Sequence, residues 1–181
     1  MTKKHLGGHA DLTHIDDGVL EMAKKLNFKT MLDIGCGPGG MVQRSKEFGI
    51  MSEGIDGYPG KNQISDIKIN IHDFTIGKFD HQLEFDLAWS CEFVEHVEER
   101  YLPNFMHSFQ KCKNVFMTYA PPGTPGHHHV NCRPEQYWKD VFYSYGFVYD
   151  EELTKELRNK STMKRDFVRK CGLVFRRKAD V

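Results

Sequence analysis

The amino-acid sequence predicts a single α/β domain in which helices cover both faces of a parallel sheet. Short apolar runs typical of buried strands alternate along the chain with longer stretches of helical periodicity, which is the order that such a sheet requires. The first apolar run ends in an acidic residue and a cluster of glycines, as does a strand that turns sharply into a helix. A length of 181 residues suits one domain with a sizeable core.

The expected elements follow one another without a repeat or a low-complexity linker. A helix over 16–26 comes first, because its apolar residues recur at helical spacing and Asp16 is positioned to cap it. Strands are expected at 30–35, 50–56, 67–72, 85–90, 114–119, 147–149 and 172–176, and helices at 41–48, 93–112 and 134–145. The stretch 57–66, rich in Gly, Pro, Asn and Asp, is expected to replace a helix with a loop. Within this single domain, residues 1–28 are interpreted as a helical cover and residues 29–181 as the core.

Composition excludes several classes of protein. The 25 basic residues balance 25 acidic ones, so no overall charge attracts nucleic acid or an anionic membrane. Five cysteines with no Cys-x-x-Cys pair argue against a disulfide framework and a zinc cluster. The N-terminus lacks the apolar stretch of a signal peptide, and no window approaches a membrane span, so we expect a soluble cytoplasmic protein. A basic run over 155–178 is interpreted as a solvated face, with anion binding as the alternative.

The most informative segment, 32–40, reads Leu-Asp-Ile-Gly-Cys-Gly-Pro-Gly-Gly. Such a turn is typical of nucleotide binding, because glycine permits positive φ and lets a ligand approach where a Cβ would collide, and the next helix aims its first amides at the ligand. Gly35, Gly37 and Gly40 also satisfy the dinucleotide pattern, which leaves an NAD(P)-binding oxidoreductase as one alternative. Asp33 favours a different ligand, since a carboxylate there repels a pyrophosphate but suits a cofactor with an amino group and a sulfonium.

This segment resembles the first motif of class I S-adenosylmethionine-dependent methyltransferases, in which the acid binds the methionine amino group directly or through water. The resemblance implies a Rossmann-like sandwich with a mostly parallel sheet and an antiparallel last strand, and transfer of the methyl group to an acceptor. The whole chain also resembles short methyltransferases encoded by tailed phages. Besides the oxidoreductase, the alternative from another class is a non-catalytic protein that binds S-adenosylmethionine or supports a partner enzyme.

Cofactor contacts are implied at the carboxyl ends of the strands, where ligands bind in open α/β sheets. By the resemblance, Asp56 bonds the ribose hydroxyls, Asp73 meets the adenine amino group, and Phe74 packs against the ring. The residues expected around the cofactor are Asp33, Gly35, Cys36, Gly37, Gly39, Asp56, Gly57, His72, Asp73, Phe74, Ser90 and Cys91. The alternative for Asp56 and Asp73 is that they only form turns.

A second group of chemically active side chains follows the fourth strand. If 92–96 is helical, then Glu92, Glu95 and His96 lie on one face and point the same way. The loop 127–129 contains three adjacent histidines, and one of them can complete the group. Two carboxylates with one or two imidazoles suit Mg²⁺, Mn²⁺ or Fe²⁺.

Over 92–138 the chain resembles the small-RNA 3′-terminal 2′-O-methyltransferases, whose Glu-x-x-Glu-His helix and later histidine bind a divalent metal; ubiquinone-pathway O-methyltransferases carry a similar segment. The resemblance implies Mg or Mn held by Glu92, Glu95, His96 and His128, with His128, His129 and Glu92 as catalytic groups. We expect an oxygen acceptor in a small molecule or a nucleic-acid terminus, although the RNA-binding domains of those enzymes have no room here. Many small-molecule methyltransferases carry Glu-His-Val without a metal, and in that alternative a histidine of 127–129 is the general base.

Overall fold

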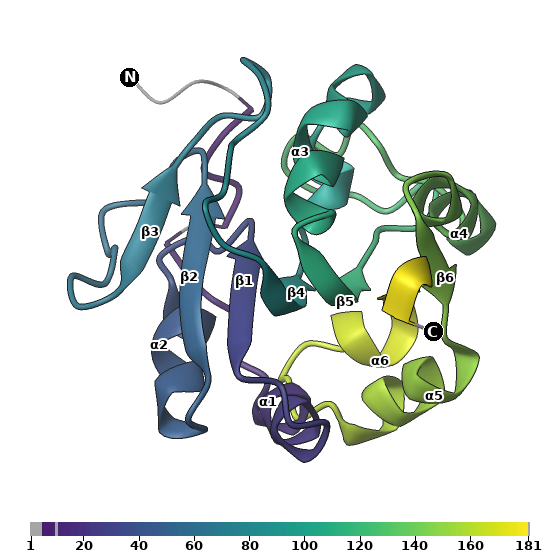
Figure 1. The fold of residues 1–181 in the computed structure, drawn as a ribbon. Coiled ribbons are helices and arrows are strands. Elements are labelled where there is room, and N and C mark those ends of the chain that lie inside the picture. The colour runs from purple at the N-terminus through teal and green to yellow at the C-terminus, as the bar shows by residue number, and fades with distance from the viewer. Residues whose placement is uncertain (1–4, 10, 181) are drawn as a thin grey trace.

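The computed structural model describes residues 5–9 and 11–180, which form a seven-stranded sheet with helices on both faces (Figure 1). The strands are β1 (Thr30–Ile34), β2 (Met51–Asp56), β3 (Lys68–Ile71), β4 (Phe85–Ser90), β5 (Cys112–Thr118), β6 (Phe147–Tyr149) and β7 (Gly172–Arg177). The α-helices are α1 (Asp17–Lys25), α2 (Gly40–Glu47), α3 (Leu102–Phe109), α4 (Glu135–Ser144), α5 (Glu151–Lys160) and α6 (Phe167–Cys171). Short 3₁₀ turns lie at Val94–His96, Glu99–Tyr101 and Lys178–Asp180.

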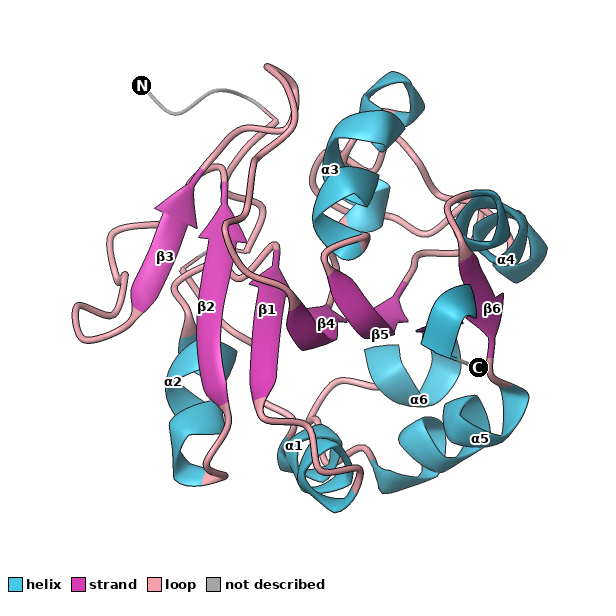
Figure 2. Ribbon diagram, in the orientation of Figure 1, coloured by secondary structure: helices cyan, strands magenta, loops and turns pink. Residues whose placement is uncertain are grey.

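The strand order across the sheet is β3-β2-β1-β4-β5-β7-β6; Figure 2 labels every strand except β7. The first five strands of that order run parallel, and β7 is antiparallel to both β5 and β6. The prediction of a mostly parallel sheet with an antiparallel last strand is therefore confirmed. The strand order reverses between β1 and β4, so the carboxyl ends of these two strands form the position where ligands bind in such sheets.

Alternate residues of the strands pack into two apolar layers, one on each face of the sheet. Met31 of β1 packs in the layer that includes α1, α2 and α5, whereas the next residue, Leu32, packs in the layer beneath α3 and α4. Aromatic side chains such as Phe105 and Trp138 fill the second layer. Most side chains of both layers are buried, so the sheet gives the strand ends a rigid base.

Most expected elements lie within one to three residues of their observed bounds. The stretch 57–66 contains no helix, as expected. The helix expected over 93–112 is wrong at its start: Glu92 has a φ of +54°, a conformation that cannot continue into a helix, and α3 begins only at Leu102, with Pro103 in its first turn. The helices α5 and α6 are not anticipated by the sequence analysis.

The expected N-terminal cover is not helical where it reaches the carboxyl edge of the sheet. Helix α1 packs in the apolar layer beside α5, while residues 5–9 and 12–14 reach the strand ends in extended and turn conformations. Residues 1–4 and 10 of this expected cover lie outside the described residues. Among the helices that the structure describes, none has the length and apolar character needed to cross a membrane.

Asp16 connects α1 to the segment that follows α5. Its side chain is fully buried, and Oδ1 accepts the amides of Val19 at 3.2 Å and Thr162 at 2.9 Å. Its Oδ2 accepts the hydroxyl of Ser161. The predicted helix cap is confirmed, and the same carboxylate joins two distant parts of the chain.

Replacement of Asp16 by alanine should reduce the free energy of unfolding by about 2 to 4 kcal/mol, because it removes a helix cap and leaves buried donors without an acceptor. Urea unfolding followed by circular dichroism measures the change. The matched control is Asp17→Ala, which breaks a half-exposed ion pair with Arg44 and should cost at most about 1 kcal/mol. Equal losses in the two variants would contradict this account of Asp16.

Candidate active site

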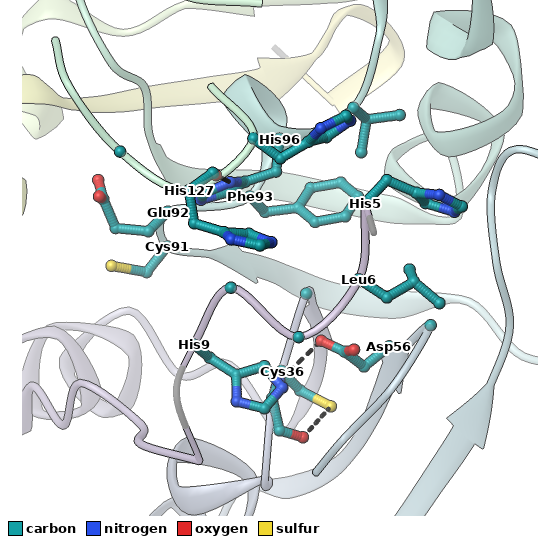
Figure 3. A pocket seen from close by; sticks show the side chains of 18 of the residues that line it. His5, Leu6, His9, Cys36, Asp56, Cys91, Glu92, Phe93, His96 and His127 are labelled. Carbon is teal, nitrogen blue, oxygen red and sulfur yellow. Dashed lines mark hydrogen bonds between the residues drawn. The ribbon is translucent and has the colours of Figure 1, made fainter. Parts of the chain in front are cut away.

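A cavity of about 610 Å³ opens at the carboxyl edge of the sheet (Figure 3). Its volume is in the range of small-molecule sites. One wall consists of the glycine turn after β1 and the ends of β1, β2 and β3; the other consists of residues 91–93, 96–98 and 124–129. Residues 5–9 cross between the two walls. The cavity therefore brings together most residues of both functional groups that the sequence predicts; Gly39, Ser90 and Glu95 are outside its lining.

The turn between β1 and α2 requires glycine at two positions on the cavity. Gly35 has a φ of +79°, and a Cβ there would lie 2.5 Å from the ring of Phe93. Gly37 has a φ of +51°, and its amide donates to Oδ2 of Asp56 at 2.9 Å. A side chain at either position would be strained, and at Gly35 it would also collide with its neighbour. The turn thus leaves exposed backbone where a ligand can approach closely.

Two carboxyl groups, Asp33 and Asp56, lie side by side on this wall. Asp33 is only 2% exposed, and burial together with the neighbouring charge of Asp56 raises its pKa well above the usual range. Asp56 accepts the amide of Gly37 through one oxygen and the amide of Tyr58, at 2.7 Å, through the other. Asp56 therefore forms the turn, and its oxygens keep lone pairs for a ligand in the cavity.

The end of β3 adds a carboxylate and an aromatic ring to the same wall. Asp73 Oδ1 accepts the amide and the hydroxyl of Thr75 at 2.9 and 2.7 Å, and its Oδ2 lies 3.1 Å from Nε2 of His5. Phe74 is buried and, with His72, lines the cavity. Asp73 thus forms a turn, and its role toward a ligand stays a prediction.

Two of the expected cofactor residues lie outside the described lining of the cavity. Ser90 donates its hydroxyl to the carbonyl of Ile34 at 2.9 Å, because side chains alternate along β4 and its neighbour Cys91 takes the cavity side. Gly39 is the N-cap of α2, and a Cβ there would collide with Cδ1 of Ile67. The expected residues that do line the cavity are Asp33, Gly35, Cys36, Gly37, Asp56, Gly57, His72, Asp73, Phe74 and Cys91.

The segment after β4 is a turn and not the expected helix. The amide of Glu92 donates to Oγ1 of Thr118 at 2.9 Å, which fixes its left-handed conformation, and a single 3₁₀ turn over Val94–His96 follows. The carboxyl groups of Glu92 and Glu95 nevertheless stay close, since Glu92 contributes to raising the pKa of Glu95. Burial is the larger cause of that increase in pKa.

The structure assembles a group of metal-ligand type from Glu95, His96 and His129. One ligand atom of each lies within 4.8 Å of the others. Glu95 is fully buried, and among the described residues its carboxyl oxygens make no well-formed hydrogen bond, while the carboxyl of Glu92 lies next to them. A buried carboxylate without a partner is costly unless a proton or a cation neutralises it. A carboxylate with two imidazoles suits a divalent first-row metal ion, so these residues fit one.

Both imidazoles are oriented by backbone carbonyls. Nδ1 of His96 lies 2.7 Å from the carbonyl of His127, and Nδ1 of His129 lies 3.0 Å from that of Thr124. Because a carbonyl only accepts, each Nδ1 carries the proton and each Nε2 keeps a lone pair. Burial lowers the pKa of His96 to about 4, so the ring is neutral near pH 7. Either Nε2 can therefore bind a cation or accept a proton.

Of the two histidines expected to act from the loop 127–129, the structure brings His129 into this group and not His128, which the sequence analysis assigns as the ligand. His128 has a φ of +48°, and its ring centroid lies 6.1 Å from that of His5, so the structure does not bring it into the group. His129, expected as a catalytic group, takes that position. Three adjacent histidines carry no signal in the sequence that tells them apart.

The sequence predicts a cover within residues 1–28, but not that the histidines of residues 5–9 join the lining of the cavity. His5 and His9 join histidines from four other segments, so that eight of the ten histidines of the chain line this one cavity. Only His81 and His107 do not. No local pattern predicts this, because the contacts join residues far apart in the sequence.

Comparisons with known proteins agree with this architecture. Residues 8–123 match the family model described as a methyltransferase domain. No curated protein is significantly similar to the chain. The structure is similar to magnesium protoporphyrin IX methyltransferase from Synechocystis PCC 6803 with bound SAH, with 13% identity, 88% of this chain and 79% of that chain covered, and a TM-score of 0.61.

Two further solved structures are similar at comparable levels. For 1,6-didemethyltoxoflavin-N1-methyltransferase from Burkholderia thailandensis the identity is 11%, the coverage 89% of this chain and 76% of that chain, and the TM-score 0.62. For the methyltransferase domain of bacterial CtHen1-C the identity is 17%, the coverage 88% of this chain and 95% of that chain, and the TM-score 0.59. Identities this low show a shared fold.

The buried acid Asp33 should make stability depend on pH. Its pKa is higher in the folded than in the unfolded state, so the wild type should lose stability as pH rises from about 4 toward the folded pKa. Asp33→Asn lacks this loss, and its stability relative to wild type should increase by at least about 1 kcal/mol between pH 4 and 8. Urea unfolding across that pH range measures the difference.

The control for this experiment is Asp17→Asn. A hydrogen bond from Arg44 lowers the pKa of Asp17, so its substitution should give a pH dependence of the opposite sign. A difference between Asp33→Asn and wild type that stays constant with pH would show that Asp33 is not a strained buried acid.

Proposed function

Because the chain belongs to the methyltransferase domain family and is an S-adenosylmethionine-dependent methyltransferase, we propose that it transfers the methyl group to an oxygen nucleophile with the help of a divalent metal ion. The observation that carries this proposal is the buried carboxyl of Glu95, which makes no well-formed hydrogen bond, beside His96 and His129. His96 and His129 line the cavity opposite the glycine turn, and Glu95 lies behind them, outside the lining. That arrangement gives the cavity a wall for the cofactor and a wall for the acceptor.

The cofactor is proposed to bind along the wall formed by the strand ends. Its amino group and sulfonium are cations, and they would stabilise the ionised form of Asp33, which burial alone disfavours. The carboxylate of Asp56 would hold the ribose hydroxyls, while the hydrogen bonds that it accepts from the amides of Gly37 and Tyr58 fix the turn. The adenine would meet Asp73 and Phe74, which line the same wall. Gly35 and Gly37 would let the methionine part lie against the backbone.

On the acceptor side, Glu95, His96 and His129 would hold the metal ion. A divalent ion bound there supplies Lewis acidity, which lowers the pKa of an acceptor hydroxyl. The residues themselves orient the acceptor and offer an Nε2 lone pair that can take its proton. Without a metal, the same imidazoles serve as general base. Glu92 and His128 line the cavity nearby, and their predicted roles as catalytic groups and metal ligands stay predictions.

The acceptor is proposed to be a small molecule or a nucleic-acid terminus. Two of the similar structures are named for a porphyrin and a toxoflavin precursor, which supports the first class. Most of the rate enhancement is expected from holding the acceptor atom in line with the methyl group, because the sulfonium already activates it.

Cofactor binding can be tested without knowledge of the acceptor. S-adenosylhomocysteine should raise the melting temperature, whereas NAD should not. Asp56→Ala should weaken the affinity for S-adenosylhomocysteine at least about tenfold by calorimetry, because it removes charge-assisted hydrogen bonds, and Asp56→Asn should lose less. Asp66→Ala, an exposed acid away from the cavity, serves as control. Stabilisation by NAD alone would refute the cofactor assignment, and an unchanged affinity of Asp56→Ala would leave Asp56 as a turn residue only.

The metal site can be tested by Mn²⁺ titration of the full-length protein, followed by electron paramagnetic resonance. Glu95→Gln and His129→Ala should each weaken Mn²⁺ binding at least about tenfold through loss of a ligand. His128→Ala, one residue away and outside the group, should change it by less than about twofold. Loss of binding in His128→Ala but not in His129→Ala would favour the ligand expected from the sequence. If wild type binds no Mn²⁺, the histidine base is the remaining mechanism.

A further inference from the structure

Residues 5–9, called here the N-terminal strap, cross the cavity between its two walls (Figure 3). Each end of the strap is anchored. Nε2 of His5 lies 3.1 Å from Oδ2 of Asp73, at the end of β3. His9 donates from Nε2 to the carbonyl of Tyr58 at 2.7 Å, while its Nδ1 accepts the amide of Asp11 at 3.0 Å. Both anchors lie beside residues of the proposed cofactor wall.

The middle of the strap fills a gap left by a glycine. A Cβ built on Gly57 would lie 2.6 Å from Cδ2 of Leu6, which is closer than two such atoms can approach. The φ of Gly57 is not in the left-handed region, so the backbone itself does not require glycine there. What requires it is Leu6, whose side chain occupies the space of a side chain at position 57. Leu6 thus supplies an apolar group directly after Asp56.

The strap also contacts the glycine turn and the acceptor wall. A Cβ on Gly37 would lie 3.3 Å from Cγ of His9. A Cβ on Gly8 would lie 3.0 Å from Cδ2 of His127 and 3.6 Å from Cε1 of His96. The strap therefore packs closely against both walls, and a cavity of about 610 Å³ still remains beneath it. The strap covers part of the site and leaves room for a ligand beneath it.

We propose that the strap is a wall of the cofactor pocket, in which Leu6 packs on one face of the adenine ring and Phe74 on the other. This inference rests on the proposed function, since it takes the adenine to lie beside Asp73. Leu6 and Phe74 both line the cavity. The residues that precede them in the chain, His5 and Asp73, form a hydrogen bond with each other.

The test is the affinity of the full-length protein for S-adenosylhomocysteine, measured by calorimetry. Leu6→Ala should weaken binding about five- to twentyfold, because it removes apolar surface from the ligand. Gly57→Ala should also weaken binding, because the added methyl displaces Leu6 and with it the strap. The double variant Leu6→Ala with Gly57→Ala should bind no worse than Leu6→Ala alone, since the collision is gone. Leu83→Ala, an exposed leucine outside the cavity, is the control and should bind as wild type does.

The anchors give a second measurement. Hydrogen exchange at residues 6–9 should slow when S-adenosylhomocysteine binds, and His5→Ala combined with His9→Ala should reduce this protection. His107→Ala breaks a similar imidazole–carboxylate pair outside the cavity, at 3.2 Å from Asp80, and should leave the protection unchanged.

The possible results separate the two proposals. No binding of S-adenosylhomocysteine by wild type refutes the proposed function. Binding by wild type with an unchanged affinity of Leu6→Ala refutes the strap as a wall of the pocket. Tighter binding by Leu6→Ala refutes it as well, because the strap would then compete with the cofactor.

Discussion

The hydrogen bond from the Gly37 amide to the Asp56 carboxylate is the contact on which the site depends most. It joins the end of β2 to the turn after β1, so the position of one strand end fixes the backbone at the other. The amides of Gly37 and Tyr58 each donate to one oxygen of this carboxylate. Asp56 also lies next to Asp33, whose ionised form is disfavoured by burial. The protein keeps two acids together at the point where the strand order reverses, at a cost in stability that a cationic ligand would offset.

Local patterns predict the strands of this fold well. The apolar run of β4 and the short strand β6 have the expected bounds, because a buried strand needs only its own residues to be recognised. Helix α5 is missed because it is mostly charged, although Asp150 caps it and two acids begin it, a signal that could have revealed it. The turn at Glu92 has no such signal, since it depends on the hydroxyl of Thr118, 26 residues further along the chain.

The site residues, like the elements of the fold, are predictable where their signal is local and not where they depend on distant contacts. The glycine turn with Asp33 is recognisable because its chemistry lies within nine consecutive residues. The choice between His128 and His129 depends on one left-handed residue and on the carbonyl of Thr124, and neither can be inferred from three identical neighbours. The contact of Leu6 with Gly57 joins residues 51 positions apart, so the sequence places Gly57 near the cofactor but gives no sign that Leu6 fills the space beside it.

The gathering of eight histidines around one cavity makes the imidazole signals of a proton NMR spectrum a nearly complete map of the site. His5 and His9 report on the strap, and His96 and His129 report on the group around Glu95. His81, buried against Ser108, and the more exposed His107 provide internal references away from the ligand. Ligand binding, ion binding and movement of the chain above the cavity are therefore distinguishable in an unlabelled sample.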